Sequence, residues 1–107
     1  MAKSVRLREL AATDLADAIE HYRRQASDQT ALDFIDAAER GISRIGRSPQ
    51  VGSLRFAYEL EVPDLRAWPL RRFPYTVFYM DAPDVIDVWR ILHTRRDIPT
   101  TLEPPGT

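Results

Sequence analysis

The sequence predicts an α+β fold of two layers, in which an antiparallel helical hairpin packs on a small, mainly antiparallel sheet in the order β-α-α-β-β-β. Apolar residues alternate with polar ones near the N-terminus, recur with helical spacing through the first half, and gather in β-branched and aromatic runs in the second half. A chain of 107 residues has the usual size of one domain. A strand ahead of the hairpin is buried only by pairing with the later strands beneath it, which favours two layers.

The N-terminal part of the chain combines a short strand with a helix. Val5 and Leu7 alternate with polar neighbours in residues 4–8, which is typical of a half-buried strand. From about residue 11 the period changes to that of an amphipathic helix. We therefore expect a first helix over roughly residues 11–26.

A second, longer helix is expected after a short break. Ser27 and Asp28 are good N-cap residues, and the apolar stripe continues to about Gly46, before Pro49 prevents any extension. Cations that suit the negative end of this helix's dipole are Arg40, Arg44 and Arg47. Two helices joined by so few residues pack antiparallel, which predicts the hairpin.

The second half of the chain predicts a loop and then three strands. Residues 51–64 have a weak pattern and are interpreted as a connecting loop with some extended structure. Residues 65–71 form a strand that Pro69 restricts to an edge or a bulge. Residues 75–80 are β-branched or aromatic on both faces, so this strand is expected to be central and covered on both sides. Residues 85–93 form the last strand.

Composition excludes several classes of protein. Hydrophobic residues make up 44% and charged residues 29%, which is ordinary for a globular domain. The net charge is −1, whereas a protein that grips a nucleic-acid backbone usually carries a basic excess. Cysteine is absent, so neither disulfides nor thiolate metal sites form, and no cofactor is expected. No segment has the pattern of a membrane span or a signal peptide, which predicts a cytoplasmic protein.

Several features of the sequence resemble those of one known superfamily. They are the element order, the break at residues 49–52 (PQVG), and residues 71–99, RRFPYTVFYMDAPDVIDVWRILHTRRDIP. These features resemble the RelE/ParE toxin superfamily. The ending at residues 91–97, ILHTRRD, is most similar to the ParE branch, the plasmid-stabilisation toxins. The resemblance covers about residues 4–100.

The resemblance implies the toxin of a type II toxin–antitoxin system, held inactive by a cognate antitoxin. Residues 1–100 would then form the single toxin domain and residues 101–107 a flexible C-terminal tail. ParE-like members poison DNA gyrase and are neutralised by a ParD-like antitoxin, whereas RelE-like members cut mRNA on the ribosome. A shared fold does not choose between these activities, so the site residues must. A third reading is a toxin-like protein without toxicity that serves only as a partner for its antitoxin.

The residues that RNA cleavage requires are missing at the matching positions. Cleavage by 2′-hydroxyl attack needs a proton acceptor, cations and an acid for the leaving oxygen. RelE-like nucleases supply lysines on the second strand, arginines on the third and fourth, and an aromatic hydroxyl near the C-terminus. The resemblance places Ala67 and Pro69 at the lysine positions and Thr76 at the third-strand arginine. Only Arg95 or Arg96 matches the fourth-strand arginine, which favours a toxin that is not an enzyme. A RelE-like endoribonuclease is the alternative.

Two arginine pairs bracket the predicted C-terminal sheet. We expect Arg71–Arg72 and Arg95–Arg96, at the ends of neighbouring strands, to form one cationic patch. Arginine binds carboxylates in a bidentate manner, so the patch suits an antitoxin tail or an acidic protein target. The structural alternative is that one arginine of each pair is solvated and the other is paired within the chain, with Asp97 as a partner for the second pair.

Tryptophan and histidine supply the remaining candidates. Trp68 lies beside Pro69 on the expected edge strand and is a better interface residue than Trp89, which a central position favours as core. His93 ends the last strand, where a hydrogen-bonded structural role is the common one. Because His21 lies far away in the sequence, a metal site is not expected. The candidate antitoxin- or target-binding residues are Trp68, Arg71, Arg72, His93, Arg95 and Arg96.

Overall fold

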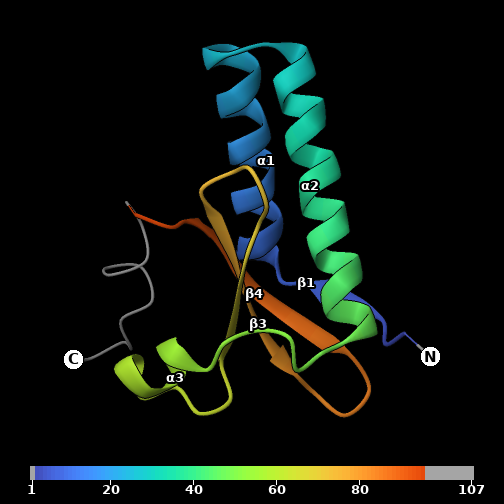
Figure 1. The fold of residues 1–107 in the computed structure, drawn as a ribbon, viewed down its shortest axis with the longest axis vertical. Helices are drawn as coiled ribbons and strands as arrows, with labels where there is room; N and C mark the ends of the chain where they lie inside the picture. Colours follow the sequence, from blue (N-terminus) through green and yellow to red (C-terminus); the bar gives the residue numbers. More distant parts are fainter. Residues whose placement is uncertain (1, 96–107) are drawn as a thin grey trace.

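A computed structural model describes residues 2–95 of the chain (Figure 1). The elements of this part are, in order, β1 (Val5–Leu7), α1 (Glu9–Gln25), α2 (Asp28–Arg47), α3 (Arg55–Leu60), β2 (Arg66–Pro69), β3 (Tyr75–Asp81) and β4 (Ile86–His93). The predicted α+β fold, with a strand, a helical hairpin and a three-stranded meander, is confirmed. The predicted tail at residues 101–107 lies outside the described residues.

The four strands form one sheet in the order β1-β4-β3-β2. β1 runs parallel to β4, and the other neighbours are antiparallel, as expected for a mainly antiparallel sheet. The predicted edge strand is β2, where Pro69 pairs with Thr76 at the end of the ladder. Proline lacks a backbone N–H donor, which an edge position tolerates.

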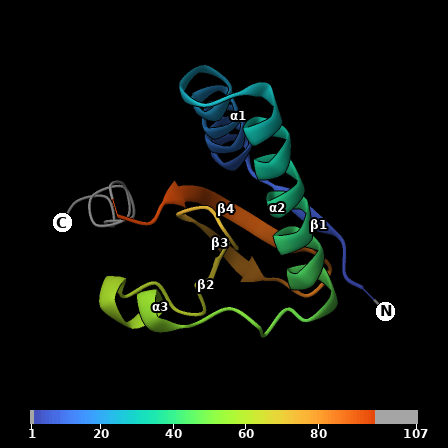
Figure 2. The ribbon, with the colours of Figure 1, turned by 45° about the horizontal axis from the view of Figure 1, so that its top comes forward.

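The helix pair covers one face of the sheet, and α3 lies on the other side, as Figure 2 shows. The turn between α1 and α2 is set by Ser27, whose Oγ accepts a hydrogen bond from the N–H of Thr30 at 3.0 Å. This confirms Ser27 as an N-cap. The core under the helix pair is formed by Ala11, Ala18, Phe34, Ala38, Ile45, Leu70, Tyr75, Val77, Tyr79, Ile86, Val88 and Ile91.

The segment expected to be a loop with some extended structure, residues 51–64, does pair with β2 at Ser53, but it also contains α3, which the sequence did not predict. The helix is only six residues long, too short to show a periodic apolar stripe. Its N-cap residue, Leu54, makes no side-chain hydrogen bond, although the Oγ of Ser53 accepts one from the N–H of Arg55 at 3.0 Å. The helix is also held by tertiary packing, since the ring of Phe56 lies 5.3 Å from that of Phe78. The second core on this face contains Ala57, Leu65, Ala67, Phe78 and Leu92. β3 is therefore covered on both sides, as predicted.

A partly buried ion pair joins α1 to β4. Asp14 accepts hydrogen bonds from Nε and Nη2 of Arg90 at 2.7 and 2.8 Å, and from the N–H of Ile91 at 3.0 Å. β4 has a bulge here, because Phe78 pairs with Arg90 and Tyr79 with Val88. The bidentate geometry fixes the register of the helix on the strand.

The loop that leaves α2 is tied to the core by a tyrosine. The Tyr79 hydroxyl accepts a hydrogen bond from the N–H of Gly52 at 2.9 Å and donates one to the carbonyl of Pro49 at 2.7 Å. Burial raises the pKa of Tyr79, while the hydrogen bond from Gly52 acts to lower it. A Cβ at residue 52 would lie 2.6 Å from the hydroxyl oxygen, so the loop needs glycine there.

We expect Gly52→Ala to lower the free energy of unfolding by about 1–3 kcal/mol, because the new methyl must displace the tyrosine hydroxyl. Denaturant unfolding of the full chain measures this. Gln50→Ala changes an exposed side chain of the same loop and serves as the control, with no more than a small effect. A Gly52→Ala variant as stable as its parent would contradict the account.

A second prediction concerns Asp87, which is buried beside Arg6 of β1 and Arg8, the N-cap residue of α1. Its Oδ2 accepts a hydrogen bond from Nε of Arg8 at 2.8 Å, and Arg6 lies 3.5 Å from Oδ1. The hydrogen bond from Arg8 is the main cause of the lowered pKa of Asp87. Because the folded pKa is below the unfolded one, acid protonates the unfolded chain first. Stability should therefore fall as the pH drops below about 4 and through the folded pKa.

Chemical unfolding over an acidic pH series measures this dependence. Asp87→Asn should flatten the acid loss of stability, and Arg8→Gln should reduce it, because each removes one side of the interaction. An unchanged slope in both variants would show that other carboxyl groups determine acid unfolding.

Candidate functional site

The turn between β2 and β3 presents the first predicted arginine pair to solvent. The N–H of Leu70 donates to the carbonyl of Tyr75, and the N–H of Tyr75 donates to the carbonyl of Phe73, both at 2.8 Å. Arg71 and Arg72 lie exposed in this turn. Arg72 has a φ of 71°, in the left-handed region that side-chain-bearing residues enter at a cost of about 1–2 kcal/mol.

An aromatic cluster holds this turn against the helix pair. The ring of Phe73 lies 5.1 Å from that of Tyr22 on α1 and 5.3 Å from that of Phe34 on α2. Tyr75 at the start of β3 lies 5.2 Å from Phe34. Edge-to-face pairs of this kind add to the burial of the rings. The backbone of the turn that carries the arginine pair is therefore packed beside the helix pair.

A glycine brings β2 close to the same helix. Gly41 is buried on α2, and a Cβ there would lie 2.7 Å from Cδ2 of Leu70 and 3.7 Å from Cδ1 of Trp68. The side chain of Trp68 is consequently half-buried against α2 at Gly41. Close approach of this kind is a recognised use of glycine.

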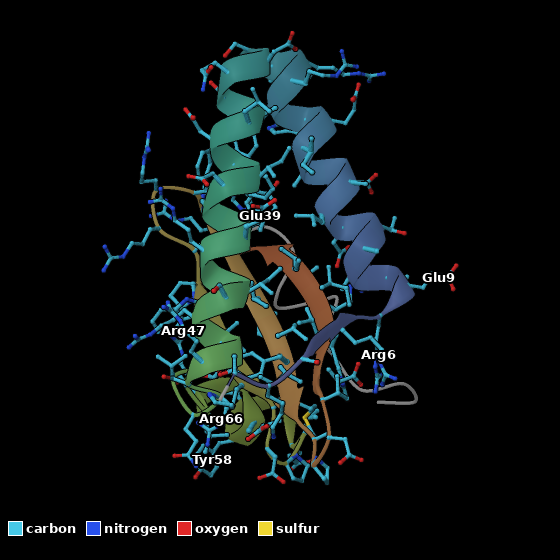
Figure 3. All side chains as sticks on the ribbon, turned by 90° about the vertical axis from the view of Figure 1, so that its right-hand side faces the viewer. Arg6, Glu9, Glu39, Arg47, Tyr58 and Arg66 are labelled. Carbon is cyan, nitrogen blue, oxygen red and sulfur yellow. The ribbon has the colours of Figure 1, made fainter. Side chains whose placement is uncertain are left out.

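These segments enclose an open groove of about 830 Å³ between α2 and the β2–β3 turn. Its lining residues are Asp33, Asp36, Ala37, Glu39, Arg40, Gly41, Ser43, Arg44, Arg47, Trp68, Arg71 and Arg72. Figure 3 shows two of them, Glu39 and Arg47, at different heights along α2. We call this surface the arginine groove.

The charges of the arginine groove are only partly compensated. Arg40 pairs with Asp36 at 3.1 Å, one turn earlier on α2. No carboxylate within residues 2–95 lies within ion-pair distance of the other groove arginines, which are Arg44, Arg47, Arg71 and Arg72. Unpaired guanidinium groups around an indole suit the binding of anions. The groove thus offers recognition of negative charge.

The structure brings three of the predicted site residues together and separates the others. Trp68, Arg71 and Arg72 line the arginine groove. Arg95 is exposed after β4, where the N–H of Thr94 donates to the carbonyl of Pro74, so it lies at the same end of the sheet as the turn but outside the groove lining. Arg96 lies outside the described residues.

His93 has the contacts of a structural residue. Its ring lies 5.4 Å from that of Tyr75, and its Nδ1 accepts a hydrogen bond from the N–H of Arg95 at 3.3 Å. Trp89, expected in the core, is half-buried on the α3 side of the sheet, and the guanidinium of Arg8 lies 4.6 Å from its ring centre. This cation–π contact joins the N-cap residue of α1 to β4.

Sequence reasoning missed the contribution of α2 to the site. The sequence pattern assigns three arginines to the helix dipole, yet all of them line the arginine groove: Arg40, Arg44 and Arg47. Their spacing of four and then three residues is a usable signal, because it places them on one face of a helix. What the spacing does not show is that the β2–β3 turn lies beside that face.

The described residues offer neither a metal site nor a helix that could span a membrane. Within residues 2–95 no group of three or more His, Cys, Asp or Glu side chains is placed to hold a metal ion. None of the helices in this part has both the length and the apolar character that crossing a membrane requires.

Comparisons with known proteins identify relatives of the fold. A solved chain of the chromosomal ParDE toxin–antitoxin system from P. aeruginosa superposes with a TM-score of 0.73 at 21% sequence identity, covering 86% of this chain and 96% of that one. No curated protein sequence matches. The family model for the ParE toxin of the type II toxin–antitoxin system parDE matches residues 5–98. The match spans most of the sequence, so this chain belongs to the ParE toxin family.

Proposed function

We propose that this chain is a cytoplasmic, non-enzymatic toxin that inhibits DNA gyrase and is neutralised by a ParD-like antitoxin bound to it as a hetero-oligomer. The observation that supports binding over catalysis is the arginine groove. It presents cations and an indole, which recognise a surface, and its described lining includes carboxylates but neither histidine nor lysine. Membership of the ParE family supports both the gyrase target and the ParD-like partner.

Three positions match catalytic residues of RelE-like nucleases by resemblance, and none of them presents an accessible acid or base here: Ala67, Pro69 and Thr76. Ala67 is buried in the second core, and Thr76 is buried with its hydroxyl 2.9 Å from that of Thr94. Pro69 has no side-chain donor or acceptor. A general acid or base must reach its proton at hydrogen-bond distance, for which Ala67 and Pro69 carry no group and the Thr76 hydroxyl is buried against that of Thr94. These observations weigh against the RelE-like endoribonuclease.

We expect the purified chain to reduce supercoiling by DNA gyrase while leaving translated mRNA intact, because binding to the enzyme needs no catalytic group on the toxin. Supercoiling on a relaxed plasmid and primer extension on ribosome-bound transcripts measure the two activities in parallel. Cut transcripts with normal supercoiling would overturn the proposal in favour of the endoribonuclease. A chain that affects neither reaction, and arrests no host when induced, would be a non-toxic partner of its antitoxin.

The arginine pair of the turn provides a variant test. Arg71→Ala together with Arg72→Ala should weaken binding to gyrase or to the antitoxin by about tenfold or more, since charge-assisted hydrogen bonds are lost. The melting temperature should stay near that of the parent, because both side chains are exposed. Calorimetric titration measures binding. Unchanged affinity for both partners would remove the turn from the binding site, and a large fall in melting temperature would show the pair to be structural.

A further inference from the structure

The unpaired cations of the described part are concentrated in one place. Outside the arginine groove, carboxylate or carbonyl partners are present for Arg6, Arg8, Arg23, Arg24, Arg55, Arg66 and Arg90. Of the described arginines outside the groove, only Arg95, which is exposed, has no such partner. Inside the groove only Arg40 has an ion-pair partner among residues 2–95. Like charges held together repel one another, so this arrangement needs a reason other than folding.

The helix dipole explains only part of the cluster. Arg44 and Arg47 lie in the last turns of α2, where cations interact favourably with the carbonyl end of the helix. Arg71 and Arg72 belong to the β2–β3 turn and gain nothing from it. Arg72 moreover holds a left-handed backbone conformation, which strains any residue with a side chain.

The charge along α2 changes sign within the groove. Asp33, Asp36 and Glu39 line its N-terminal part, whereas Arg40, Arg44 and Arg47 line its C-terminal part. A nucleic-acid backbone carries negative charge along its whole length and would meet those carboxylates. A polypeptide with an acidic block at one end matches both parts. The half-buried indole of Trp68 lies in the same groove and offers apolar surface for one side chain.

We propose that the arginine groove docks an acidic segment of a partner polypeptide, with its carboxylates on the arginines of α2 and of the β2–β3 turn and an apolar side chain on Trp68. The acidic end of the segment lies over the C-terminal part of α2. The inference rests on the proposed function only for the identity of the natural partner. Synthetic peptides test the groove by themselves, so the docking site and the gyrase target fail separately.

The direct test is fluorescence anisotropy of the full chain with a labelled peptide that carries a block of glutamates and one leucine. Arg44→Ala with Arg47→Ala should weaken its binding about tenfold or more, since charge-assisted contacts are lost. Arg24→Ala with Arg55→Ala removes the same charge from arginines that have partners outside the groove, and should leave binding unchanged. Equal loss in both double variants would overturn the proposal, because only net charge would then matter.

Two further arms test the chemistry of the ligand. Replacing the peptide's leucine by serine should weaken binding to the parent chain, and this arm leaves the fold of the protein untouched. Equal binding of both peptides would remove Trp68 from the site. A DNA duplex should fail to displace the acidic peptide at moderate salt. Displacement by DNA at lower concentration than by unlabelled peptide would show a nucleic-acid surface and overturn the assignment.

Discussion

The packing of Phe73 between the two long helices is the contact on which the candidate site depends. Its ring meets Tyr22 and Phe34, which belong to different helices, and Tyr75 joins the same cluster from the sheet. The cluster thus connects both arms of the hairpin with the first residues of β3. Since the arginines of the turn immediately precede Phe73, their position relative to α2 is set by hydrophobic packing and not by their own charges.

The element order could be predicted from the sequence because local patterns encode it. Alternation marks β1, helical periodicity marks α1 and α2, and Pro69 marks the edge strand. α3 escaped prediction because tertiary contacts through Phe56, not intrinsic propensity, hold so short a helix. Within the site, Trp68 and the turn arginines were found from residue type, and their place in the groove supports that choice without testing a binding role. The α2 arginines joined them only through packing between distant segments.

The two faces of the sheet differ in what they present. One is buried by the helix pair, and the other is covered by α3 over an apolar core that includes Ala67, Phe78 and Leu92. In the part of the chain described, clustered unpaired charge lies at the border between α2 and the β2–β3 turn. A shared fold can carry unrelated activities, so membership of the family leaves the working surface to be found from side chains. Here the border of the hairpin, not the centre of the sheet, has the character of a recognition surface.

At Arg72 the turn requires a backbone conformation that is unfavourable for a residue with a side chain. Glycine adopts a positive φ with almost no steric penalty, so the turn itself would form more easily with glycine at this position. An arginine here lowers the stability of the native state and adds one more exposed cation to the turn beside α2. The backbone of this residue is fixed by the turn, whereas its exposed side chain keeps the rotamer freedom that binding of a ligand would remove. The strain at Arg72 therefore determines where the cation leaves the backbone, but not where its guanidinium group points.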